Sequence, residues 1–184
     1  MSISIIAGST GLIGRNVVEI LCNKQESVIA LTRRPISDLP INANQLVIDF
    51  DSFEKNGSLP SCNHVFICLG TTIKKAGSQE NFRKVDIGYC LSIAKKAKES
   101  GAETLSLISS IGADSTSKNL YLITNRELED AIQELHFPVV YIFRPRFLVV
   151  QRSEKRLSEV VVLKFAKIMD FFLVGSASKY RSVK

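Results

Sequence analysis

The stretch Gly8-Ser9-Thr10-Gly11-Leu12-Ile13-Gly14 decides how this chain is expected to fold. It follows a short apolar run, Ile3 to Ala7, and it opens a segment whose apolar residues recur at helical spacing. A glycine-rich turn between a strand and a helix is the setting of a dinucleotide fingerprint, in which glycines allow a sharp turn, close approach of a pyrophosphate and tight helix packing. The Gly-x-x-Gly-x-x-Gly spacing differs from that of the simplest Rossmann domains, and a glycine-rich turn without a ligand is the alternative.

The rest of the chain alternates short apolar runs with amphipathic segments. After the first strand, we expect further strands at residues 27–32, 45–50, 64–69, 104–109 and 139–143. Helices are expected after the glycine turn, over residues 82–100, and around Leu128 to Leu135. In the 82–100 segment one face carries Phe82, Val85, Tyr89, Ile93 and Ala97. This order predicts an α/β Rossmann fold, a doubly wound parallel sheet with helices on both faces.

Length and composition indicate one globular domain over residues 1–184. The chain has 184 residues, 45% of them hydrophobic and 23% charged, so a core forms without disulfides or a metal. We expect residues 146–184 to form a small or truncated substrate-side part. Within it, Val160 to Val174 is too short and too charged to span a membrane. A helix packed on the core or on a partner subunit is expected there, with an interfacial membrane helix as the alternative.

The net charge and the cysteines indicate which cellular compartment and which binding partners to expect. Cys22, Cys62, Cys68 and Cys90 form no C-x-x-C pair, and the N-terminus lacks a basic leader segment, so we expect a cytoplasmic protein with free thiols. The net charge is +6, but the chain contains no basic block or RNA-binding motif, so a nucleotide phosphate is favoured over nucleic acid. His64 and His136 are the only histidines and lie far apart in the sequence, which argues against a metal site or a Ser-His-Asp triad.

The end of the second expected strand indicates which dinucleotide binds. An NAD site would place Asp or Glu there to accept from the ribose hydroxyls, whereas this chain has Arg33 and Arg34. Guanidinium groups grip a phosphate through two nitrogens, so NADP(H) is preferred over NAD(H), unless the two arginines are only a solvated pair. Asp49 either accepts from the adenine amino group or caps the following turn.

Several further motifs together resemble one family. They are Cys68-Leu69-Gly70-Thr71-Thr72, Lys75-Ala76-Gly77-Ser78, Val85-Asp86, Ser109-Ser110-Ile111-Gly112-Ala113-Asp114 and Phe143-Arg144-Pro145. With the glycine turn, this set resembles the Tat-interacting-protein-like branch of the atypical short-chain dehydrogenases/reductases. The resemblance implies an NADP(H)-binding Rossmann domain that is epimerase-like, with Leu69, Gly70 and Thr71 near the cofactor. It also implies that Ser109 or Ser110 lies beside the nicotinamide.

The superfamily's catalytic Tyr-x-x-x-Lys pair is incomplete here. Tyr121 is present, but Asn125 stands where the lysine belongs, and Asn125 can hydrogen-bond a ribose without stabilising a phenolate. Arg126 cannot substitute, because an i+5 position lies about 140° around a helix from Tyr121. Packing of Tyr121 on the sheet, and an ordinary strand-to-loop turn at Ser109 and Ser110, are the structural alternatives.

Two functions follow as expectations. The first is an NADP-dependent oxidoreductase that transfers a hydride to or from an unidentified small carbonyl or alcohol, with Tyr121 giving the proton and Ser109 or Ser110 orienting the substrate oxygen. The second is a catalytically impaired NADP(H)-binding regulator or scaffold. A homodimer is compatible with either, and the residues identify no substrate.

Overall fold

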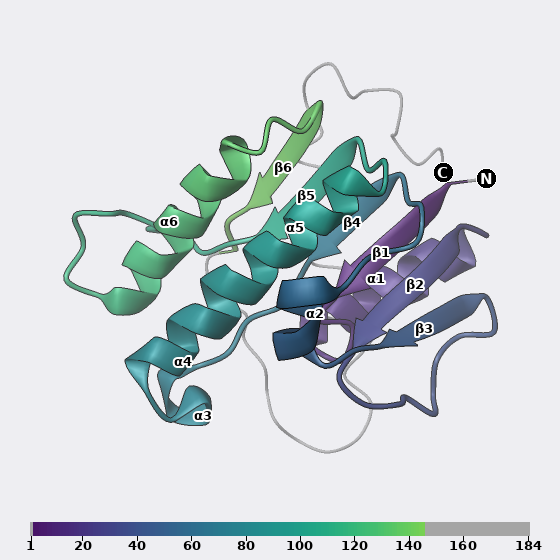
Figure 1. Cartoon of the computed structure of the whole chain (residues 1–184), viewed down its shortest axis with the longest axis horizontal. Coiled ribbons are helices and arrows are strands. Elements are labelled where there is room, and N and C mark those ends of the chain that lie inside the picture. Colours follow the sequence, from purple (N-terminus) through teal and green to yellow (C-terminus); the bar gives the residue numbers. More distant parts are fainter. Residues whose placement is uncertain (1, 146–184) are drawn as a thin grey trace. The chain divides into compact units, whose positions relative to one another are not determined.

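The computed structural model describes residues 2–145, which form a parallel sheet with helices on both faces (Figure 1). The six strands are β1 (Ile3–Ala7), β2 (Ser27–Thr32), β3 (Ala43–Val47), β4 (His64–Ile67), β5 (Thr104–Ile108) and β6 (Val139–Phe143). The helices are α1 (Leu12–Asn23), α2 (Phe50–Asn56), α3 (Ile73–Ala76), α4 (Gln79–Arg83), the π-helical turn η1 (Lys84–Tyr89), α5 (Cys90–Glu99) and α6 (Leu120–Gln133). The expected extent of one domain to residue 184, and the Val160 to Val174 helix, lie outside the described residues.

The strand order is β3-β2-β1-β4-β5-β6, and every neighbouring pair is parallel. This is the order of a Rossmann domain, so the predicted fold class is confirmed. The strand order reverses between β1 and β4. In such sheets ligands bind outside the carboxyl ends of the strands at this switch point.

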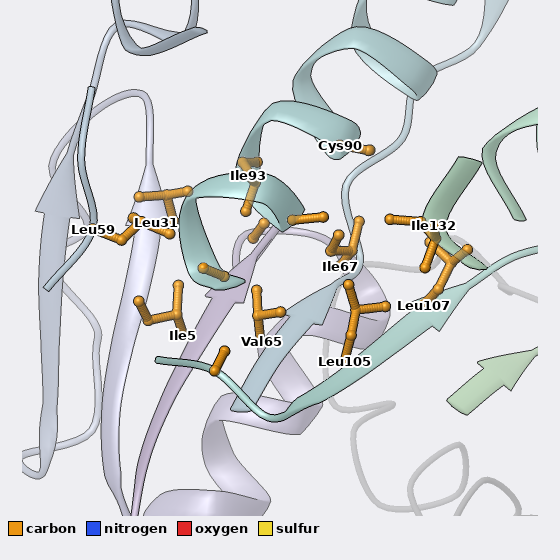
Figure 2. Packing of buried hydrophobic residues seen from close by; sticks show 14 of the residues in the cluster. Ile5, Leu31, Leu59, Val65, Ile67, Cys90, Ile93, Leu105, Leu107 and Ile132 are labelled. Carbon is orange, nitrogen blue, oxygen red and sulfur yellow. The ribbon is translucent and has the colours of Figure 1, made fainter. Parts of the chain in front are cut away.

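Most of the core lies on the sheet face that α2, α5 and α6 cover. In Figure 2, Ile5, Val65 and Leu105 extend from neighbouring strands toward α5, which presents Ile93 and Cys90. A smaller cluster on the opposite face packs Val18 and Cys22 of α1 against β1 and β2. Buried apolar residues on both faces explain why the strands read as near-continuous apolar runs.

The chain departs from the sequence prediction in four elements. The third strand was expected over 45–50, but it ends at Val47, and Phe50 begins α2 because Asp49 caps that helix. The expected helix over 82–100 is three consecutive segments, since η1 interrupts α-helical spacing. Phe82, Ile93 and Ala97 are buried as expected, whereas Val85 and Tyr89 in the π-helical turn are only partly buried. The fourth and fifth strands end earlier than predicted, at Ile67 and Ile108.

Candidate functional site

The glycine turn between β1 and α1 has a geometry that side chains would block. Gly8 has φ +81°, and a Cβ added there would lie 2.4 Å from the carbonyl oxygen of Cys68. A Cβ on Gly14 would lie 2.3 Å from the carbonyl oxygen of Gly8. The turn is closed by a hydrogen bond of 2.9 Å from the Gly11 N–H to the Gly8 carbonyl. Two of the three glycines are therefore required for β1, α1 and the end of β4 to approach each other.

The first turn of α1 offers backbone donors to an anion. Its N-cap is Gly11, which makes no side-chain capping bond, and the first turn contains no acidic residue. The amides of Leu12, Ile13 and Gly14 are the first of this helix and precede its i→i−4 ladder. Thr10 is exposed beside them, whereas Ser9 is buried and its hydroxyl lies 3.5 Å from the Leu31 carbonyl. The positive end of the helix dipole thus points at an open turn.

Arg33 and Arg34 directly follow β2 and are both exposed. Within residues 2–145 neither forms an ion pair. Arg15 of α1 is instead engaged by Asp38 and by Glu19, the latter at 3.5 Å. The two guanidinium groups after β2 therefore remain available to a ligand.

Asp49 is the N-cap residue of α2. Its Oδ1 accepts a hydrogen bond of 2.8 Å from the Ser52 N–H at the start of α2. The carboxylate is exposed, so this cap leaves its other oxygen open to solvent. The capping alternative is thus seen in the structure, and the contact with adenine remains a prediction.

A cavity of about 480 Å³ lies at the carboxyl ends of β4 and β5, next to the first turn of α1. Nine of the residues proposed from the sequence line it: Leu12, Ile13, Leu69, Gly70, Thr71, Ser109, Ser110, Tyr121 and Asn125. The other lining residues are Cys68, Asp86, Ile108, Thr124, Leu128 and Pro145. Residues from distant parts of the sequence therefore meet at the expected end of the sheet.

Tyr121 and Asn125 occupy one turn of α6 beside this cavity. Tyr121 is 40% exposed, and its ring centroid lies 6.5 Å from that of buried Phe82. The Asn125 Nδ2 donates a hydrogen bond of 2.8 Å to the Tyr121 carbonyl oxygen, so the amide is used within its own helix. Arg126 pairs with Asp130 at 2.7 Å. The lysine's charge is therefore not replaced by either neighbour.

The two serines after β5 differ in what their hydroxyls do. Ser109 is buried and donates to Glu129, which is itself only 1% exposed. Arg144 donates to both carboxylate oxygens of Glu129, with its Nε at 2.8 Å from Oε1. Ser110 is half-buried, and its hydroxyl has only a 3.3 Å contact with the neighbouring Ile111 carbonyl. Ser110 is therefore freer than Ser109 to bind a ligand oxygen.

Asp86 is a site residue to which the sequence analysis assigned no role. It belongs to the π-helical turn η1, lines the cavity, and accepts a hydrogen bond of 2.9 Å from the Thr71 N–H. Burial raises the pKa of its carboxyl to about 6, although the Thr71 bond opposes that shift. The same desolvation raises the pKa of the Cys68 thiol to about 12, which makes this lining cysteine a poor nucleophile.

Metal and membrane features are missing from the described part of the chain. No three acidic, histidine or cysteine residues between positions 2 and 145 are arranged to hold a metal ion. None of the helices in that range is long and apolar enough to cross a membrane. His64 makes a 2.9 Å hydrogen bond with Ser106 and does not line the cavity.

The sequence model of an NAD(P)H-binding family matches residues 8–148 of this chain. The chain belongs to that family. It is 38% identical over 157 residues to the protein "FMP52, mitochondrial" of Candida albicans, a match that covers 81% of this chain and 68% of the relative. It is 37% identical over 166 residues to the rat protein HTATIP2, covering 87% of this chain and 68% of the relative. The resemblance to the Tat-interacting-protein-like group is thereby confirmed.

Solved structures with the same fold include dehydrogenases and epimerases. A putative NAD-dependent epimerase/dehydratase from Bacillus halodurans aligns with a TM-score of 0.67 at 20% identity, covering 84% of this chain and 74% of that one. MoeE5 in complex with UDP-glucose and NAD aligns with a TM-score of 0.64 at 16% identity, and the match covers 78% of this chain but only 54% of MoeE5. These likenesses show the Rossmann fold.

The expectation of a cytoplasmic location is contradicted. Three relatives that are 36–38% identical to this chain are named as mitochondrial proteins. Cys22, Cys62 and Cys90 are free and buried, which is compatible with any reducing compartment and does not single out the cytoplasm.

Proposed function

We propose that the chain binds NADP(H) and transfers a hydride between this coenzyme and a small carbonyl or alcohol. The observation that carries the proposal is the junction of an uncapped, glycine-lined helix start with a cavity that contains Tyr121 and Ser110. The described residues fit a dinucleotide in further respects. Two buried hydroxyls, those of Thr32 and Thr124, have no hydrogen-bond partner within residues 2–145. Thr32 directly precedes the two arginines, and Thr124 lines the cavity.

The residues divide into phosphate-binding and reacting groups. The amides of Leu12 and Ile13 hold the pyrophosphate, and Arg33 and Arg34 hold the 2′-phosphate. The bound coenzyme supplies or accepts the hydride at its nicotinamide ring. Ser110 donates a hydrogen bond that orients the substrate oxygen, and the Tyr121 hydroxyl gives that oxygen its proton during reduction.

The coenzyme preference is tested by titrating NADPH and NADH into the chain and following binding by calorimetry. We expect NADPH to bind at least tenfold more tightly, because each guanidinium forms charge-assisted hydrogen bonds with the extra phosphate. Replacing both residues, Arg33→Ala with Arg34→Ala, removes most of that difference. Arg126→Ala is the matched control, because this half-buried arginine pairs within its own helix. Equal affinities in the unmodified chain would refute the NADP preference.

A catalytically impaired, NADP(H)-binding regulator is the second candidate. It is favoured by one observation, the Asn125 amide that donates to the Tyr121 carbonyl where the superfamily has a lysine. Activity on a panel of aldehydes, ketones and quinones separates the two functions. Turnover in the unmodified chain that Tyr121→Phe abolishes supports the enzyme. Tight coenzyme binding without turnover, combined with turnover in Asn125→Lys, supports the regulator.

A further inference from the structure

The cavity contains one carboxylate that the proposed chemistry does not use. Asp86 directs Oδ2 to the Thr71 N–H, at 2.9 Å, so this backbone amide holds the carboxylate at the loop after β4. Its Oδ1 has no hydrogen-bond partner within the described residues, and a Cβ added to Gly70 would lie 3.4 Å from it. The absence of a side chain at Gly70 leaves this oxygen beside open cavity.

The backbone around Asp86 is also unusual. The π-helical turn η1 separates α4 from α5 and contains Asp86 as its third residue. A π-helical turn inserts a residue into an α-helix and is frequent at functional sites. Asp86 in this turn lines the cavity, while Phe82 before it and Cys90 after it are buried in the core.

No positive charge in the described lining balances this carboxylate. Of the cavity residues between positions 2 and 145, none is Lys, Arg or His, and Asp86 is the only acid. The cations adjacent to it in sequence are engaged elsewhere, Arg83 with Glu127 at 2.7 Å and Lys84 with Asp51 at 2.6 Å. Asn125 adds no charge. A lysine at position 125 would balance the Asp86 carboxylate, whereas the described lining of this site is negative above the pKa of Asp86.

We propose that Asp86 makes the cavity bind the oxidised, positively charged nicotinamide ring more tightly than the reduced, neutral ring. The inference rests on the proposed function, which puts that ring in the cavity. NADP+ and NADPH carry identical phosphates and sugars, so a charge in the cavity discriminates between them only at the ring. A partly desolvated carboxylate interacts with a cation more strongly than it would in water. The site is then a sensor of the oxidised coenzyme, and in an enzyme the tighter binding of NADP+ shifts the equilibrium of the bound reactants toward carbonyl reduction.

The experiment titrates NADP+ and NADPH separately into the full chain at pH 7.5 and measures both dissociation constants by calorimetry. The unmodified chain is expected to bind NADP+ about tenfold more tightly than NADPH, a result that depends on no variant. Asp86→Asn retains the shape and the acceptor for the Thr71 N–H but loses the charge, so it weakens NADP+ about tenfold and leaves NADPH unchanged. Asp86→Glu, which keeps the charge, retains the preference for NADP+.

A control variant and three further outcomes complete the test. Glu80→Gln removes an exposed carboxylate from α4, outside the cavity lining, and changes neither constant. Equal binding of NADP+ and NADPH by the unmodified chain overturns the role of Asp86 and leaves the proposed function intact. The same holds if Asp86→Asn weakens both coenzymes equally, since that result indicates only a disturbed Gly70–Thr71 loop. Binding of neither coenzyme by the folded, unmodified chain overturns the proposed function and this inference together.

Discussion

The two ends of the candidate site differ in how much of the superfamily pattern they retain. At the proposed phosphate-binding end, the glycine turn and the start of α1 (the phosphate end), an added side chain on Gly8 or Gly14 would clash with backbone, and α1 has no side-chain N-cap. At the proposed reacting end, the cavity lined by Tyr121 and Ser110 (the reacting end), Tyr121 remains, but Asn125 replaces the lysine and leaves the Asp86 carboxylate without a cation in the described lining. The residues proposed to bind the coenzyme are separate from those proposed to react, so the first set can persist while the second changes.

The largest expected effect comes from a substitution in the glycine turn at the phosphate end. Gly8→Ala places a Cβ 2.4 Å from the Cys68 carbonyl oxygen in a left-handed backbone, and we expect it to lower the free energy of unfolding by about 3 kcal/mol or more. Gly77→Ala is the matched control, because Gly77 has the same φ of +81° with no atom within 4 Å of an added Cβ. We expect that control to lose only about 1 kcal/mol. Similar losses for both in urea unfolding would show that crowding at Cys68 is unimportant.

The next largest effect concerns the ion pair between Arg144 and the buried Glu129, which accepts a hydrogen bond from Ser109 at the reacting end. Arg144→Met leaves Glu129, 1% exposed, without its cation, and we expect a loss of about 3 kcal/mol in unfolding free energy. Arg126→Met removes a comparable bidentate pair with Asp130, but the Asp130 side chain is 45% exposed and water can solvate it, so we expect a loss below about 1 kcal/mol. The two losses are measured by urea unfolding. If they were equal, burial of Glu129 would not be what makes its pair important.

The smallest effect is a pH dependence that sharpens the comparison at Asp86. Burial raises the folded-state pKa of its carboxyl to about 6, above the ordinary value of 3.8, so the folded chain binds more protons than the unfolded chain between those values. Stability contributed by this group therefore falls as pH rises from about 4 to about 6 and stays low above that range. Asp86→Asn removes this pH dependence. The free energy of unfolding of the variant minus that of the unmodified chain therefore rises from pH 4 to pH 6, by on the order of 1 kcal/mol once screening by water is allowed for. A constant difference between pH 4 and pH 7 in urea unfolding would contradict the raised pKa.

The fold was predictable because its signals are local. Residues 3–7, 27–32 and 139–143 were predicted as strands and agree with β1, β2 and β6. The glycine turn identified the strand-to-helix junction, because only a residue without a side chain fits at Gly8. The start of α2 was missed because Asp49 follows an apolar run, and its capping bond to Ser52 decides where the helix begins.

The reacting end was less predictable because it depends on contacts between distant segments. The burial of Glu129 with Arg144 and Ser109 joins α6 to the ends of β5 and β6, and no spacing in the sequence encodes that meeting. Asp86 was noticed only as part of a motif, because its place at the cavity depends on the contact of its carboxylate with the Thr71 N–H, fifteen residues earlier in the chain. The available signal was an acid four residues after Phe82 and three before Tyr89, on the apolar face of the expected helix.

The central claim is that the open amides of α1 hold the phosphates of NADP(H). Amide-resolved ¹H–¹⁵N NMR of the full chain, recorded while NADP+ is added, tests it most directly. We expect the signals of Leu12, Ile13 and Gly14 to shift saturably, together with the side-chain signals of Arg33 and Arg34, while Gly77 on the exposed loop between α3 and α4 stays in place. A saturable titration in which the α1 amides do not move would contradict the claim.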